Sequence, residues 1–157
     1  MRSWFITFML LLAVPALEAG ELHLILSGKA IHLDPGDYNE SNWGVGFEYD
    51  FTPRGHWIPF VAGASFLDSN EDVSNYLGGG TKYRRHLGGG WHLDGGIIGF
   101  VMTRKDYHDN SPFIGVLPFA SLGTERVALN ITYVPRVQQK TSPLIYFQLM
   151  FRLAQYD

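Results

Sequence analysis

The chain has 157 residues, which is enough for one hydrophobic core but not for two. It contains no cysteine, so disulfides, a thiolate nucleophile and a cysteine-based zinc site are all excluded. The formal net charge of the chain is -3, which is close to neutral. The one compact basic group in the sequence, Arg84-Arg85-His86, is too small to predict binding of nucleic acid.

The first 19 residues have the pattern of a secretory signal peptide. Arg2 precedes an apolar run over 4–12, and small residues follow at Ala16 and Ala19. The apolar run is too short to cross a bilayer comfortably as an uncleaved helix. The sequence therefore predicts export, with cleavage after Ala16 or Ala19, and one mature domain over 20–157.

The mature part has the composition of an all-β protein. No apolar stretch after residue 19 approaches the length of a membrane helix. Aromatic residues make up 15% of the chain, there are 18 glycines, and signals for helix starts are nearly absent. A secreted sandwich or barrel and an outer-membrane barrel both fit this composition.

Apolar and polar residues alternate with a period of two over 43–51, 127–133 and 145–153. Such segments have about the length of one tilted membrane-spanning strand, which is about nine residues. With the less regular segments included, we predict eight strands, at 21–32, 42–51, 57–67, 76–86, 91–103, 112–122, 126–135 and 143–153.

The connections alternate in length along the chain. Three are tight turns, at 52–56, 87–90 and 123–125, and four are longer and polar, at 33–41, 68–75, 104–111 and 136–142. Every second connection of an antiparallel meander lies at the same end, so turns and loops separate, as in outer-membrane barrels. Because lipid leaves no strand edge unpaired, we predict a closed, eight-stranded, antiparallel up-and-down outer-membrane β-barrel.

The barrel is expected to have a partly apolar interior. In the strands at 57–67 and 112–122, residues of both parities are apolar, whereas a porin would place polar residues on one face. Eight strands enclose only enough space for packed side chains. However, glycines in the fourth and fifth strands, Gly78 and Gly80 among them, would leave room for a slender ligand.

Four residues whose side chains could take part in catalysis fall where the longer loops begin, and so converge on one rim: His32, Asp68, Ser69 and Arg104. An imidazole that accepts a proton from a hydroxyl supports acyl transfer. Arg104 would hold a phosphate or stabilise an oxyanion. Neighbours on a strand point to opposite faces, so a linear Ser-His-Asp triad requires a break in the strand, and Asp68 is expected to orient or balance charge. The other histidines match no metal-site spacing, and we expect neither metal nor cofactor.

Short motifs in the same order resemble those of the bacterial lipid A palmitoyltransferases, the PagP family. The matching stretches cover nearly all of the mature chain and are Phe66-Leu67-Asp68-Ser69, 42–47, 117–123, 132–135 and Tyr146-Phe147. The resemblance implies an outer-membrane barrel with an internal acyl-chain pocket. It also implies that His32, Asp68 and Ser69 are the essential surface residues.

Further positions take their roles from the same resemblance. Pro118 and Pro135 fall on prolines that open a lateral gap for lipid, and Gly80 falls on the glycine at the floor of the acyl pocket. The prolines of a second lateral opening are replaced by Ser27 and Asn42. The family's amphipathic helix before the first strand is expected to be missing, which would make this a divergent member.

Strand one is irregular, because Leu22, Leu24 and Leu26 share the parity of His32. His32 therefore faces inward only if a bulge near Gly28 shifts the phase of the strand.

The function predicted is an outer-membrane acyltransferase with its active site on the extracellular side. It would move a palmitoyl chain from a glycerophospholipid to a hydroxyacyl chain of lipid A, as a monomer with no nucleic-acid partner. A lipid A deacylase or phospholipase would use the same rim, although no His-x-Ser pair of the deacylase kind is present. A non-catalytic structural barrel would instead have polar networks inside.

Overall fold

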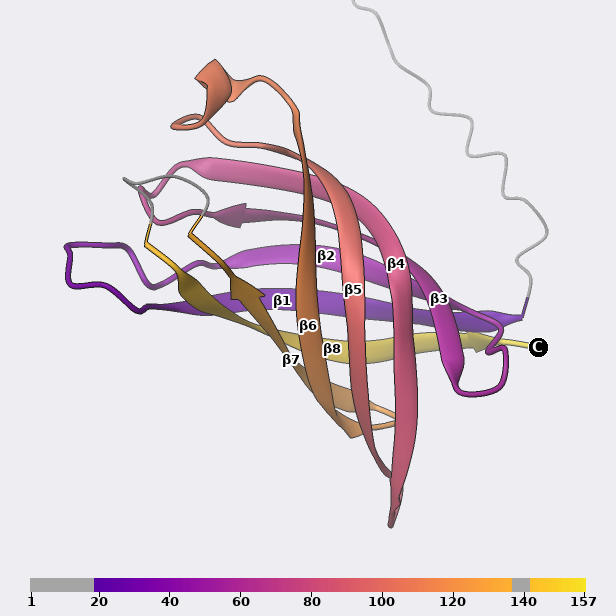
Figure 1. Ribbon diagram of the computed structural model, residues 1–157. Coiled ribbons are helices and arrows are strands. Elements are labelled where there is room, and N and C mark those ends of the chain that lie inside the picture. Colours follow the sequence, from indigo (N-terminus) through magenta and orange to yellow (C-terminus); the bar gives the residue numbers. More distant parts are fainter. Residues whose placement is uncertain (1–18, 137–141) are drawn as a thin grey trace, which may run out of the picture.

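The alternating segments form eight antiparallel strands that close into a barrel in sequence order (Figure 1). The computed structural model describes residues 19–136 and 142–157. β1 pairs with β8, so no strand edge is left at the ends of the sheet. The predicted all-β up-and-down barrel is confirmed. Apart from Ala19, the predicted signal peptide lies outside the described residues.

Strand bounds agree with the predictions to within a few residues. The strands are β1 (Gly20–His32), β2 (Gly44–Phe51), β3 (Trp57–Leu67), β4 (Val73–Gly88), β5 (Trp91–Thr103), β6 (Phe113–Thr124), β7 (Val127–Val134) and β8 (Leu144–Tyr156). A short 3-10 turn, η1 (His108–Asn110), lies between β5 and β6. In the described part of the chain, no helix is long and apolar enough to cross a membrane.

One connection differs from its prediction. The loop expected over 68–75 is only 68–72, no longer than the turn over 52–56, because β4 begins at Val73. Its polar residue Ser74 was assigned to the loop, but it is fully buried and points into the barrel. We call the end of the barrel with 33–43 and 68–72 the loop end, and the opposite end the turn end.

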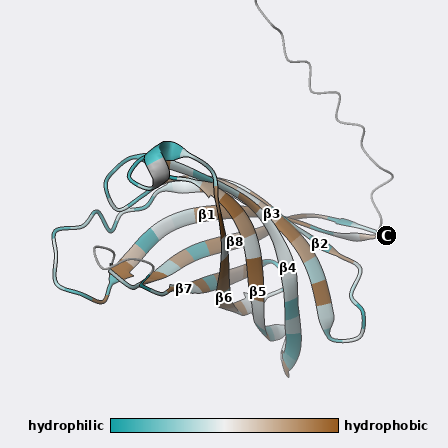
Figure 2. Ribbon diagram, turned by 45° about the horizontal axis from the view of Figure 1, so that its top comes forward, coloured by the Kyte–Doolittle hydropathy of each residue, from teal (hydrophilic) through white to brown (hydrophobic). Residues whose placement is uncertain are grey.

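The outward side chains form an apolar surface. Exposed residues on all eight strands are aliphatic or aromatic, including Leu26, Val45, Val61, Leu77, Ile97, Ile114, Leu129 and Leu153. Ile114 is 82% exposed. Figure 2 shows hydrophobic residues along the strands and hydrophilic residues in the loops near η1. A continuous exposed apolar surface is unusual in water but is required of a barrel that faces lipid.

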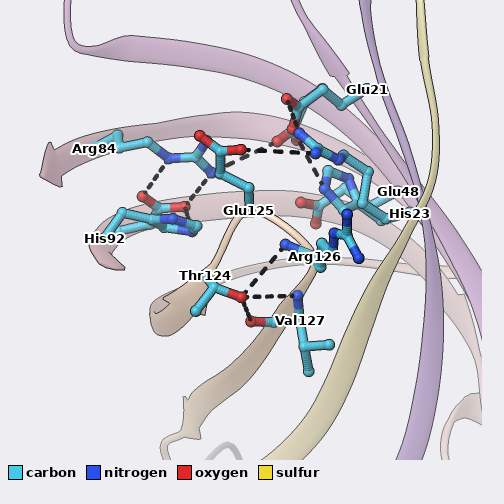
Figure 3. A network of polar contacts seen from close by, with 12 residues as sticks. Glu21, His23, Glu48, Arg84, His92, Thr124, Glu125, Arg126 and Val127 are labelled. Carbon is cyan, nitrogen blue, oxygen red and sulfur yellow. Dashed lines mark hydrogen bonds and ion pairs between the residues drawn. The ribbon is translucent and has the colours of Figure 1, made fainter. Parts of the chain in front are cut away.

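The interior has an apolar middle layer between two polar groups. The middle layer is the buried cluster of Ile25, Phe60, Ala62 and Met150. Towards the loop end, Gln148 donates a hydrogen bond to Ser27 at 3.1 Å and Asn130 donates one to Gln148 at 3.3 Å, and all three residues are buried. Towards the turn end lies a charge network of Glu21, His23, Glu48, Asp50, Lys82, Arg84, His92, Asp94 and Arg152 (Figure 3). The predicted partly apolar interior is therefore found, with the apolar part confined to the middle layer.

Two cations hold the charge network together. Lys82 Nζ lies 2.6 Å from Glu48 Oε1 and 2.8 Å from Asp50 Oδ2, and all three side chains are buried. Arg84 makes a two-pronged contact with Asp94, at 2.9 and 2.8 Å. The space between Lys82, Arg84 and Asp94 is about 10 Å³, enough for about one water, and a larger space of about 250 Å³ lies outside it, next to Glu21, Asp50 and Tyr156. The network thus closes the barrel at the turn end.

Two interior glycines of β4 lie close to the backbone of β5. Gly78 and Gly80 pair with Ala62 and Phe60 and share their inward face. A Cβ added at Gly80 would collide with the carbonyl oxygen of Ile97, and one at Gly78 with that of Gly99. A side chain therefore does not fit at either position in this arrangement, and the room that the glycines would leave for a ligand stays a prediction.

The seam between β6 and β7 is open at the loop end. Pairing stops at Phe119 and Thr132, although β6 extends to Phe113 and β7 to Val134. Pro118, the residue next to the last pair, has no N–H to donate and so cannot continue the ladder. Figure 1 shows the two strands diverging above this point. We call this gap the β6–β7 opening.

The seam between β1 and β2 is closed instead. Beyond the last strand pair, Ser27 and Gly44, the ladder continues through Asn42 N to Gly28 O at 3.2 Å and Ala30 N to Glu40 O at 3.1 Å. Ser27 and Asn42, the two positions where the resemblance leads us to expect prolines, are both buried. Residues that can donate backbone hydrogen bonds have thus sealed this side of the barrel.

A bulge in β1 resolves the phase of His32. The register with β8 shifts between Ser27 and Lys29. Ile25 and Ser27 are buried before the shift, whereas Ala30 is buried after it. One extra residue therefore turns His32 inward, as expected for a bulge near Gly28.

Candidate active site

A histidine and a serine meet at the loop end, inside the barrel mouth. His32 is the last residue of β1, and Ser69 is the second residue after β3. A hydrogen bond of 2.9 Å joins His32 Nε2 and Ser69 Oγ. The histidine side chain is only 4% exposed. When its other nitrogen carries the ring proton, Nε2 accepts the hydroxyl proton, as a general base must.

Asp68 lies beside Ser69 but faces away from the histidine. Its Oδ1 accepts hydrogen bonds from the backbone N–H groups of Asn70 at 2.8 Å and Asp72 at 3.2 Å. Its Oδ2 accepts the hydroxyl of Ser74 at 2.9 Å. The carboxylate is 2% exposed and holds the β3–β4 turn that presents Ser69. β3 ends at Leu67, so strand alternation does not apply here, yet no linear Ser-His-Asp triad forms.

Arg104 completes this side of the rim. Its guanidinium lies 3.8 Å from Asp68 Oδ2 and makes two hydrogen bonds of 3.1 Å to Asp106. Two carboxylates therefore neutralise its charge in the present arrangement. Binding of a phosphate or an oxyanion would require one of them to give way, and that role stays a prediction.

The loop over 33–43 supplies two contacts to His32 that the sequence did not predict. The ring of Tyr38 stacks on the imidazole, with centroids 4.0 Å apart and planes inclined by 11°. Glu40 Oε1 lies 3.7 Å from His32 Nδ1. The turn-forming run Asp34-Pro35-Gly36-Asp37 was the available signal, because a tight turn there folds the next residues back onto β1.

The loop and the β3–β4 turn are also tied to each other. Asn39 donates its backbone N–H to Ser69 O at 3.0 Å and its side-chain amide to Asp68 O at 3.0 Å. Asn42 donates its side-chain amide to Leu67 O at 2.9 Å. The two residues of the His32–Ser69 pair are therefore fixed relative to each other by backbone contacts.

The remaining predicted positions lie below or beside the pair. Pro118 is exposed on the outer face at the edge of the β6–β7 opening, and Pro135 is the residue after β7. Gly80 lies opposite Phe60 and Ile98 at the level of the apolar cluster, one inward position above Lys82. None of these three contacts the His32–Ser69 pair, so their roles in lipid access and chain length remain predictions.

A cluster at the turn end has the spacing of metal ligands. Ligand atoms of Glu21, His23 and Asp50 all lie within 4.8 Å of one another. Both carboxylates already form ion pairs: Glu21 with Arg152 at 3.1 Å and Asp50 with Lys82 at 2.8 Å. Neighbouring positive charges oppose the binding of a further cation, so these residues do not fit a metal ion.

Comparison with known families now bears on this geometry. The model of the family described as "Antimicrobial peptide resistance and lipid A acylation protein PagP" matches residues 31–150, from Ile31 to Met150, which is more than half of the chain. The chain belongs to the PagP family. The matched range includes the candidate pair and both prolines of the β6–β7 opening.

Individual relatives carry the same family name. A lipid A acyltransferase PagP of Methylobacillus flagellatus is 33% identical over 99 residues, which cover 62% of this chain and 53% of that protein. That of Laribacter hongkongensis is 33% identical over 100 residues, and that of Proteus mirabilis is 35% identical over 102 residues. Their matches cover 63% and 62% of this chain and 48% and 47% of those proteins. The chain spans about half the length of the curated relatives it matches.

Two solved structures align with most of this chain at low sequence identity. Ail of Yersinia pestis aligns with a TM-score of 0.48 at 9% identity, over 87% of this chain and 99% of Ail. The N-terminal β-barrel domain of Pseudomonas aeruginosa OprF aligns with a TM-score of 0.45 at 10% identity, over 87% of this chain and 100% of that domain.

Proposed function

We propose that the chain is an acyltransferase of the bacterial outer membrane that acylates lipid A. In the finer form of the proposal, it moves a palmitoyl chain from a glycerophospholipid to a hydroxyacyl chain of lipid A. The observation that carries the proposal is the His32–Ser69 hydrogen bond of 2.9 Å above an apolar barrel interior. A proton acceptor beside a hydroxyl is what ester chemistry needs, and the apolar interior suits a hydrocarbon chain.

Outer-membrane location rests on the apolar outer surface of the closed barrel, together with family membership. The loop end would face the cell exterior, since longer connections lie outside in such barrels. Lipid surrounding the mouth would exclude water, which favours transfer to an acceptor hydroxyl over hydrolysis.

The β6–β7 opening supports lateral entry of the donor. Backbone pairs close every other seam between described strands up to the loop end, including β1–β2 and β8–β1. A membrane lipid that keeps its head group at the interface would slide its acyl chain into the barrel through this gap. Pro118 and Pro135 would serve that entry by leaving the ladder unpaired.

The buried apolar cluster offers a floor for the acyl chain. Phe60 is 3% exposed, whereas inward residues nearer the mouth such as Leu117 and Tyr146 are only half-buried. An acyl chain would therefore pass the buried polar group of Ser27, Asn130 and Gln148 and reach apolar surface at the level of Phe60. Below it, the charge network would be costly to desolvate, which sets a limit to the chain length.

Mass spectrometry of lipid A from cells that make each variant tests the proposal. Wild type should add one palmitoyl group, and His32→Ala and Ser69→Ala should add none. Ser65→Ala is a matched control, because Ser65 is an exposed serine on the outer face of β3. Loss of an acyl chain would indicate a deacylase instead, and unchanged lipid A with a correctly inserted barrel would refute both enzyme activities.

A further inference from the structure

We propose that Glu40 is a positioning residue for His32, so that Ser69, His32 and Glu40 act in series. The proposal rests on the proposed function, because it concerns the same proton transfer. It also assigns the carboxylate behind the histidine to the 33–43 loop rather than to Asp68.

Glu40 faces the histidine from the side opposite to Ser69. Its Oε1 accepts a hydrogen bond from the backbone N–H of His32 at 3.2 Å and lies 3.7 Å from the ring Nδ1. Within residues 19–136 and 142–157, Nδ1 is buried and has no hydrogen-bond partner of its own. A buried ring nitrogen without a partner is costly, and a small rotation of the carboxylate would satisfy it.

Three contacts hold Glu40 in this place. Its carbonyl oxygen accepts the N–H of Ala30 at 3.1 Å, which joins the loop to β1. Its Oε2 accepts a hydrogen bond from Lys29 Nζ at 3.0 Å. Two residues earlier, Tyr38 covers one face of the imidazole. The carboxylate thus has one oxygen for Lys29 and one for His32.

The hydrogen bond from Lys29 is the main cause that lowers the pKa of Glu40, and the backbone N–H of His32 adds to it. Both effects keep the carboxylate ionised around neutral pH. A negative charge beside Nδ1 favours the tautomer with its proton on that nitrogen, which leaves Nε2 free to accept the proton of a hydroxyl.

The chemical step shows why this matters. The hydroxyl oxygen of Ser69 bonds to the carbonyl carbon of the donor ester while its proton passes to His32 Nε2. The bond from that carbon to the glycerol oxygen then breaks, and the proton passes from Nε2 to the departing oxygen. The acceptor hydroxyl of lipid A next bonds to the same carbon and gives its proton to Nε2, and the bond to Ser69 Oγ breaks as Nε2 returns that proton to the serine. Between the two proton transfers of each step the ring is positively charged, and the carboxylate of Glu40 stabilises it electrostatically.

Asp68 cannot take this part in the present arrangement. Its two oxygens are used by Asn70, Asp72 and Ser74, and its other charged neighbour is Arg104. Its contribution to Ser69 is through the shape of the turn.

The kinetic test uses Glu40→Gln in the full chain, reconstituted in lipid with a phospholipid donor and lipid A. We expect kcat to fall at least about tenfold with KM changed by less than about twofold, because the lost charge acts on the transition state. Glu40→Asp should recover part of kcat. In a His32→Ala background, Glu40→Gln should have no further effect, because the residue acts through the histidine.

Asp37→Asn is the matched control. Asp37 is an exposed carboxylate of the same loop, and its substitution removes one negative charge while the contacts of Glu40 stay in place. Its kcat should stay within about twofold of wild type. If Asp37→Asn lowers kcat as much as Glu40→Gln, or if Glu40→Gln leaves kcat unchanged, the positioning role is wrong.

A spectroscopic measurement separates this proposal from the proposed function. The ¹⁵N chemical shifts of the His32 ring, observed without substrate, should show the Nδ1–H tautomer in wild type and a mixture of tautomers in Glu40→Gln. If wild type is inactive but its His32 tautomers differ from those of Glu40→Gln, the acyltransferase activity is refuted and the positioning role of Glu40 stands. Equal tautomer populations in both proteins would refute the positioning, whatever the activity.

Discussion

At the scale of single residues, the ion pairs at the two ends of the barrel differ in their exposure to solvent. Near the mouth, the pair Lys29 and Glu40 is open to solvent, with side chains 54% and 37% exposed. At the turn end, Lys82 is enclosed between Glu48 and Asp50, with all three side chains no more than 5% exposed. The first pair tunes a loop, whereas the second group closes the barrel, and the two should respond differently to loss of a lysine.

Lys82→Met should destabilise the barrel strongly. The substitution leaves two buried carboxylates without their cation, and breaking a buried pair in this way costs about 3–5 kcal/mol. Lys29→Met breaks an exposed pair and should change the stability little. Urea unfolding of both variants in lipid vesicles, followed by tryptophan fluorescence, measures the difference. Equal midpoints for the two variants would contradict the closing role of Lys82.

At the scale of strands, one extra residue in β1 decides where His32 points. The bulge between Ser27 and Lys29 changes the inward parity from odd to even. β1 remains paired with β2 and with β8, so the bulge reorients a side chain without opening the sheet.

Deletion of Gly28 should abolish acyl transfer while the barrel still folds. Without the extra residue, His32 would point outward to lipid and lose Ser69. Gly28→Ala is the matched control, because an added Cβ there meets only the ring of Trp43, at 3.9 Å, and φ is not positive. Transfer assays with heat-modifiability gels to verify folding test this. Activity in the deletion variant would show that the phase of β1 does not place the histidine.

A disulfide across the β6–β7 opening should block transfer reversibly. Pro118 and Tyr133 are the next residues beyond the last pair, Phe119 and Thr132, and both are exposed on the outer face. Cysteines at these two positions would be the only thiols in the chain. Oxidation should stop transfer and reduction should restore it, because the donor enters here.

The control disulfide joins Val45 and Ser65, which are partners across the closed β2–β3 seam. It should leave transfer unchanged in both redox states. If the oxidised pair across the β6–β7 opening retains full activity, the donor enters by another route.

At the scale of the whole molecule, the apolar middle layer of the interior sets the expected depth of the acyl-chain pocket. Substitution of Phe60 by Ala should deepen it and shift preference towards longer acyl chains, at a cost of about 3–5 kcal/mol in stability. Val61→Ala is the control, since Val61 is the next residue and points to lipid. Competition between donors of different chain length reports the preference. An unchanged preference would place the floor elsewhere.

Much of this architecture follows from local sequence pattern. Alternation over 43–51 and 145–153 predicts strands and their outward faces, and the order of turns and loops predicts a meander. The convergence of His32 and Ser69 follows from the same order, because both lie where chain segments reach the loop end. These features depend on neighbours in sequence, so sequence reveals them.

Other features depend on neighbours in space. The path of the 33–43 loop, which brings Glu40 to His32, is set by contacts with β1 and with the turn of Asp68. In the sequence, Gly78 and Gly80 suggest free space, whereas in the folded barrel the backbone of β5 lies close to both glycines. The charge network joins residues from β1, β2, β4, β5 and β8, which no local pattern brings together.

The most direct test of the central proposal is transfer by purified, reconstituted protein from a phospholipid labelled in its palmitoyl chain. We predict that wild type moves the label to lipid A, and that folded Ser69→Ala leaves it on the donor. Label released as free fatty acid, or transfer by Ser69→Ala at the wild-type rate, would contradict acyl transfer by the His32–Ser69 pair.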